Sequence, residues 1–184
     1  MSEIDPRIAY LDDIEVAPKN PWETFLAVTT QIDQLGRSII ERTVGKEALA
    51  HIRARSRGEP HTEISSEDRE YHHRISIYLF KVWAGRTVGE FRFEGIGEGY
   101  ILLTRYAKSQ AADLSDRDAL RITISHYPPR QPQLITYESE AGAEVPKIEI
   151  KTVIEALQPV ALHYTRLDCM NQDELRALVK PPRA

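Results

Sequence analysis

The chain has 184 residues, of which 41% are hydrophobic and 28% are charged, and its formal net charge is −4. These values are ordinary for a globular protein, and the length allows one domain to bury a core without disulfide bonds or metal ions. The acidic balance argues against a protein whose whole surface follows a nucleic-acid backbone, although it leaves room for a local basic patch.

The single cysteine, Cys169, cannot form an internal disulfide bond, which fits a reducing compartment. The first ten residues lack the basic start and the apolar run of a secretion signal. No window approaches the roughly 18 consecutive apolar residues that a membrane span needs. We therefore expect a cytoplasmic protein.

Residues 1–21 are expected to form an extended arm, because prolines interrupt them and acidic side chains keep them polar. Residues 22–184 are expected to form a single domain that begins with helices over 22–57. The apolar residues of the first helix recur at steps of three and four, as one face of a helix requires: Phe25, Val28, Ile32, Leu35 and Ile39. Gly45 should end or bend this helix, and Gly58 should end a second, shorter one.

Residues 66–84 carry signals for both a helix and a strand. A serine followed by acidic residues is typical of a helix start, but the β-branched and aromatic residues between Ile75 and Trp83 favour a strand. We expect a short helical turn that leads into a strand.

Alternating apolar and polar residues predict strands over 87–94, 100–107, 119–127 and 133–139. The connections between them are too short for crossover helices, so the sheet should be antiparallel.

The region after these strands is again ambiguous. Residues 146–157 favour a helix, whereas residues 160–167, VALHYTRL, favour a further strand. Residues 74–167 should thus be mainly sheet, and a final amphipathic helix is expected over 171–180 with Asn171 as its cap. The fold class is α+β, with an antiparallel sheet of about five strands and with the N-terminal helices and the C-terminal helix packed on one face.

Three glycines, Gly95, Gly97 and Gly99, lie between two apolar runs and suggest two structures. A phosphate-binding loop needs converging backbone N–H groups at a helix N-terminus, with a lysine, serine or threonine nearby. Here Glu94 and Glu98 flank the glycines, and a strand-like run follows them. The tolerance of glycine for positive φ therefore favours a hairpin turn.

Other catalytic or metal-binding patterns are weak. The six histidines show no H-x-x-x-H spacing, and the sequence has neither C-x-x-C nor G-x-S-x-G. Cys169 and His163 are a conceivable thiol and base, but a small buried cysteine is the commoner role. We expect no cofactor and no bound metal.

The tripeptide Glu149-Ile150-Lys151 matches the E-x-K of metal-dependent nucleases, in which it lies on a strand after another acidic residue. Asp116 or Asp118 could supply that residue. A solvated charged surface is the alternative interpretation.

A nucleic-acid interpretation rests on five arginines: Arg37, Arg42, Arg53, Arg55 and Arg57. The first two follow Gly36 in a segment with weak similarity to a helix-turn-helix, in which Gly36 would lie at the turn. The last three cluster at the end of the second helix. The apolar stripe runs through Gly36 without a break in phase, which instead indicates one continuous helix.

The absence of a catalytic pattern favours a non-catalytic binding protein: an adaptor, a chaperone-like protein or a regulatory module that acts through contacts with a protein partner or with a second copy of itself. The candidate contact surface is the stripe formed by Phe25, Val28, Ile32, Leu35 and Ile39, for which packing in the protein's own core is the alternative. Nucleic-acid binding by the five arginines is the second hypothesis. A metal-dependent nuclease or hydrolase that uses Glu149 and Lys151 is the third.

Overall fold

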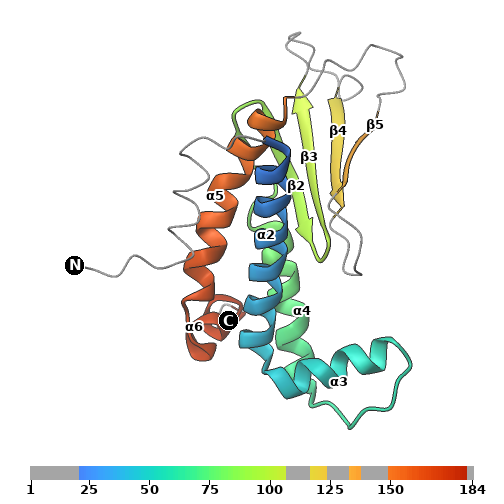
Figure 1. Ribbon diagram of the computed structural model, residues 1–184. Helices are drawn as coiled ribbons and strands as arrows, with labels where there is room; N and C mark the ends of the chain where they lie inside the picture. Colours follow the sequence, from blue (N-terminus) through green and yellow to red (C-terminus); the bar gives the residue numbers. More distant parts are fainter. Residues whose placement is uncertain (1–20, 107–116, 124–132, 138–148, 182–184) are drawn as a thin grey trace, which may run out of the picture.

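The computed structural model describes residues 21–106, 117–123, 133–137 and 149–181. Three helices come first, α2 (Pro21–Val44), α3 (Lys46–Ser56) and α4 (Ser66–Lys81). The strands β1 (Thr87–Val88), β2 (Phe91–Gly97), β3 (Tyr100–Tyr106), β4 (Arg117–Thr123) and β5 (Gln133–Tyr137) follow, and then the helices α5 (Ile150–Asp168) and α6 (Gln172–Leu178). Helices beside an antiparallel sheet confirm the α+β class (Figure 1). The expected arm, residues 1–21, lies outside the described residues except for Pro21, which begins α2.

The sheet is a meander in which each strand pairs with the next, in the order β1-β2-β3-β4-β5, and every pair is antiparallel. Its body is formed by β2, β3 and β4, of seven residues each, whereas β1 contributes two residues and β5 five. β2 and β3 form a hairpin in which Gly97 lies opposite Tyr100, and Gly99 at the turn has a φ of 80°. The prediction of a hairpin is confirmed, and the positive φ explains why glycine occupies position 99.

α4 is one uninterrupted helix, so the prediction of a strand in residues 66–84 is wrong. The Ser65 side chain caps the helix by accepting a hydrogen bond from the backbone N–H of Asp68 (3.0 Å). Ile75 and Leu79, four residues apart, are its buried positions. Tertiary packing on one helical face therefore outweighs the strand propensity of the individual residues.

α5 is likewise continuous, so the prediction of a strand over residues 160–167 is wrong. Its buried residues recur at steps of three and four, through Val153, Leu157, Val160, Tyr164 and Leu167. Pro159 removes one backbone donor from the helix, yet the buried positions keep their phase on both sides of it. Among the described residues, α4 and α5 thus occupy the two ends of the range 74–167 that is expected to be mainly sheet, and the strands lie within 87–137.

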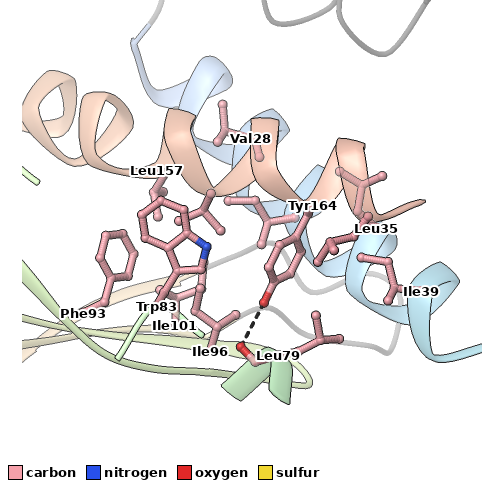
Figure 2. Close-up of a cluster of buried hydrophobic side chains, with 14 of the residues drawn as sticks. Val28, Leu35, Ile39, Leu79, Trp83, Phe93, Ile96, Ile101, Leu157 and Tyr164 are labelled. Atoms are coloured by element: carbon pink, nitrogen blue, oxygen red, sulfur yellow. Dashed lines mark hydrogen bonds between the residues drawn. The ribbon is translucent and has the colours of Figure 1, made fainter. Parts of the chain in front are cut away.

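The core lies between the helices and one face of β2 and β3. Figure 1 shows α2 and α5 side by side along most of their length. The buried side chains of β2 and β3 belong to the same apolar cluster as those of α2, α4 and α5: Phe91, Phe93, Ile96, Ile101 and Leu103. In Figure 2 the Tyr164 ring lies inside this cluster, and its hydroxyl donates to the Leu79 carbonyl (3.2 Å). Burial raises the pKa of Tyr164, so this hydroxyl remains a donor.

α6 packs on the C-terminal end of α2. Asn171 caps α6 in a reciprocal arrangement with Glu174, which confirms the predicted final helix. Arg176 of α6 donates from Nε to the Thr43 carbonyl (2.9 Å) and from Nη2 to the Val44 carbonyl (3.3 Å). Because Gly45 interrupts the helix with a φ of 105°, these last carbonyls of α2 need partners from elsewhere.

Candidate functional site

The apolar stripe of α2 lies in the core of the chain itself. All five of its residues are buried, with Leu35 the most exposed at 6%: Phe25, Val28, Ile32, Leu35 and Ile39. Their burial does not agree with the prediction that these residues form a partner-binding surface. The stripe packs mainly against α5, a helix whose second half was expected to be a strand.

The five arginines do not form one unpaired basic surface. Four of them face acidic residues: Arg37 pairs with Asp33 (2.9 Å), Arg42 with Asp168 (3.5 Å), Arg53 with Glu98 (3.8 Å) and Arg57 with Glu59 (2.9 Å). Arg55 is exposed. α2 is continuous through Gly36, so the helix-turn-helix interpretation of this segment is wrong. Nucleic-acid binding itself stays a prediction.

The E-x-K tripeptide does not lie on a strand. Glu149 is the N-cap of α5, and Lys151 is exposed in its first turn. Within the described ranges, no group of three or more histidine, cysteine, aspartate or glutamate residues is placed to hold a metal ion. Asp116 and the side chain of Asp118 lie outside the described residues.

His163 is held by a hydrogen bond to an aromatic side chain. Trp83 donates from Nε1 to Nδ1 of His163 (3.0 Å), so the neutral imidazole carries its proton on Nε2. Burial lowers the pKa of His163, and the charges of Arg86 and Arg166 lower it further. Cys169 is exposed at the end of α5. These contacts give His163 a structural partner rather than the role of a base for Cys169.

The clearest candidate site is a cavity of about 280 Å³ between α2, α4 and the tip of the β2–β3 hairpin, which we call the hairpin pocket. Its buried apolar side chains come from all these elements and from α5: Ile32, Ile40, Leu79, Ile96 and Tyr164. Its ionisable side chains are Asp33, Arg37, His73, Lys81 and Glu98, of which His73, Lys81 and Glu98 are exposed. The pocket therefore has an apolar interior and a charged mouth.

The glycines of the hairpin shape the aromatic wall of this pocket. Gly95 follows a bulge in β2, and a Cβ atom there would lie 2.5 Å from the Phe80 ring. A Cβ atom at Gly97 would overlap the ring of Tyr100. Without these atoms, Phe80 of α4 and Tyr100 of β3 meet edge to face, with their ring centroids 6.4 Å apart. The glycines therefore serve close packing as well as the turn.

Gly36 of α2 also lines the pocket. A Cβ atom at this position would lie 3.5 Å from the Tyr164 ring, which is an ordinary packing distance, so the packing itself does not require glycine there.

Two polar contacts hold the hairpin tip against the helices. The backbone N–H of Gly99 donates to Oδ1 of Asp33 (3.1 Å), while Oδ2 of the same carboxylate accepts from Nε of Arg37 (2.9 Å). Glu98 lies 3.8 Å from Nη2 of Arg53, an ion pair beyond hydrogen-bond distance. Burial lowers the pKa of the nearby His72, Glu98 opposes this shift, and Arg53 reinforces it.

Of the residues proposed from sequence as sites, only Ile32 and Arg37 line the hairpin pocket. Asp33, Gly36 and Ile40 of α2 line it as well. The other lining residues come from α4, the hairpin and α5, which are far from α2 in the sequence. In the sequence, the spacing of Gly95, Gly97 and Gly99 is the signal that marks this region, but it predicts only a turn.

Comparison of the chain with protein-family models, with curated proteins and with solved structures gave no match. None of the helices in the described segments combines the length and the apolar character needed to cross a membrane.

Proposed function

We propose that this protein is a non-catalytic binding protein and that the hairpin pocket is its binding site. The observation that carries the proposal is the combination of a concave apolar interior with a few charged groups at its mouth, which is the usual form of ligand-binding pockets. An apolar cavity of roughly 150 Å³ holds benzene. A cavity of about 280 Å³ therefore suits an apolar group larger than one benzene ring.

The pocket can be tested with a neutral apolar probe, 1-octanol, followed by ¹H–¹⁵N NMR. We expect saturable shifts of the backbone amides of Gly36 and Gly97, which line the pocket from α2 and from the hairpin. Ser76 is a half-buried residue of the pocket, and Ser76→Phe should abolish these shifts because the added ring fills the space. Ser66→Phe, at an exposed position of the same helix, should leave them unchanged.

The proposal is contradicted if 1-octanol causes no saturable shifts in the native protein, or if Ser76→Phe binds the probe as tightly as the native protein does. Circular dichroism should show that both serine variants keep the native helix content, so that a loss of binding is not a loss of folding.

A protein partner is the second form of this proposal, and one surface favours it. Ile77, which lines the pocket, is 38% exposed, and Leu178 of α6 is 41% exposed. Both residues line a shallow groove between α4 and the end of α6. We place the contact with a partner, or with a second copy of the chain, on these two residues rather than on the stripe of α2. The regulatory role and the cytoplasmic location stay predictions.

A further inference from the structure

We propose that the hairpin pocket takes a small amphiphile that has an apolar body and a single anionic head group, that is, an aliphatic or aromatic monocarboxylate whose head group lies at Lys81 and Arg37. This inference rests on the proposed function of the pocket and names the class of ligand.

The charged groups at the mouth of the pocket favour binding of an anion, because the acidic side chains of the pocket already have partners. The Asp33 carboxylate accepts from Gly99 and from Arg37, and Glu98 pairs with Arg53. Lys81 is exposed and has no ion pair among the described residues. An incoming carboxylate would therefore meet an ammonium group that has no carboxylate partner.

Arg37 adds a second donor. Only its Nε is engaged, by Asp33, and its Nη1 and Nη2 make no hydrogen bond within the described part of the chain. The side chain is 31% exposed, so these nitrogens remain accessible. A guanidinium with free Nη atoms matches the geometry of a carboxylate, and hydrogen bonds between charged groups are stronger than neutral ones.

The same charges disfavour other head groups. An ammonium head group would face the positive charges of Lys81 and Arg37 while the nearby carboxylates are already paired. A dianion such as a phosphate would be repelled by Asp33 and Glu98, which also line the pocket. The charged residues at the mouth therefore favour a head group that carries a single negative charge.

The interior explains why the body should be apolar. The Tyr164 hydroxyl is already used by the Leu79 carbonyl, so it has no proton for a ligand. The buried side chains of Ile32, Ile40 and Ile96 also line the interior of the pocket. The Phe80–Tyr100 pair forms its aromatic wall. A polar group placed among these side chains would lose its hydrogen bonds to water without replacement.

Three probes of equal chain length separate the contributions of the body and the head group: octanoate, 1-octanol and octylammonium, each kept below its critical micelle concentration. Dissociation constants are measured by NMR titration at constant ionic strength and neutral pH. We expect octanoate to bind roughly fivefold to tenfold more tightly than 1-octanol. Octylammonium should be the weakest ligand.

The head-group site is tested by reversing its charge. Lys81→Glu should invert the order of octanoate and octylammonium and leave the affinity for 1-octanol unchanged. The matched control is Lys180→Glu, which makes the same change in net charge at an exposed lysine that does not line the pocket. It should preserve the native order.

The outcomes distinguish this inference from the proposed function. If octanoate and 1-octanol bind equally and Ser76→Phe abolishes the binding of both, the anionic head group is wrong while the pocket stands. Tightest binding of octylammonium, or an unchanged order in Lys81→Glu, also overturns the inference. If none of the three probes binds, the inference and the proposed function both fail.

Discussion

At the scale of single residues, the contact between Trp83 and His163 makes stability depend on pH. Nδ1 of His163 can accept the Trp83 proton only while the imidazole is neutral. Its pKa in the folded protein is lowered from the ordinary value of 6.5, chiefly by burial. The unfolded chain therefore binds more protons in this range, so this contribution to stability is present above the unfolded pKa and is lost as the pH falls through the folded pKa.

We accordingly expect the free energy of unfolding to decrease between about pH 7 and about pH 5, and His163→Gln to reduce this dependence because an amide oxygen can accept from Trp83 without titrating. Urea denaturation across this range measures the effect. His61→Gln, a change at an exposed histidine, is the control and should retain the native slope. An equal slope in His163→Gln would rule out His163 as its source.

At the scale of elements, Arg176 joins α6 to the end of α2. It donates to the Thr43 and Val44 carbonyls, and its guanidinium carbon lies 4.3 Å from the centroid of the Tyr71 ring. Arg176→Ala would leave these carbonyls without their charged donor. We expect a loss of about 1.5–3 kcal/mol in the free energy of unfolding, measured by urea denaturation.

Two variants make this prediction specific. Arg176→Lys should recover only part of the loss, because one ammonium group cannot reproduce the planar fork of donors. Arg69→Ala, at an exposed arginine of α4, should change the stability little. If Arg176→Ala is as stable as Arg69→Ala, the link between α6 and α2 does not contribute as proposed.

A helix or strand could be predicted from the sequence where its local residue propensities agree with the way it packs in the fold. α2, the hairpin and α6 were predicted because apolar spacing, glycines and the Asn171 cap all favour the observed structure. α4 and the second half of α5 were not, because their strand-forming residues sit on helical faces that only packing reveals. The hairpin pocket could not be predicted, since it requires the pairing of elements far apart in the sequence.

At the scale of the whole molecule, a charge introduced into the buried stripe of α2 and a charge introduced at the exposed residue Ile77 should have opposite effects on folding. Phe25→Asp places a charge at a position with 0% exposure, so we expect loss of the cooperative thermal transition. Ile77→Asp should leave folding intact and weaken any self-association. Circular dichroism and sedimentation velocity over a wide concentration range measure these two effects.

Gln34→Asp is the control for Phe25→Asp, because it introduces the same charge at an exposed position of α2. A folded Phe25→Asp variant that dissociates from a complex would restore the stripe as a partner surface. Equal sedimentation of the native protein and Ile77→Asp at every concentration would remove Ile77 from the proposed contact.

The packing of α2 against α5 has a consequence for synthesis of the chain. α2 ends at residue 44, but the helix that shields its apolar face begins only at residue 150. While the ribosome adds the residues between them, that face lacks its main helical partner, although α4 can already cover part of it. Exposed apolar surface of this kind promotes aggregation of incompletely folded chains. We therefore expect the chain to be most prone to aggregation before α5 has been made.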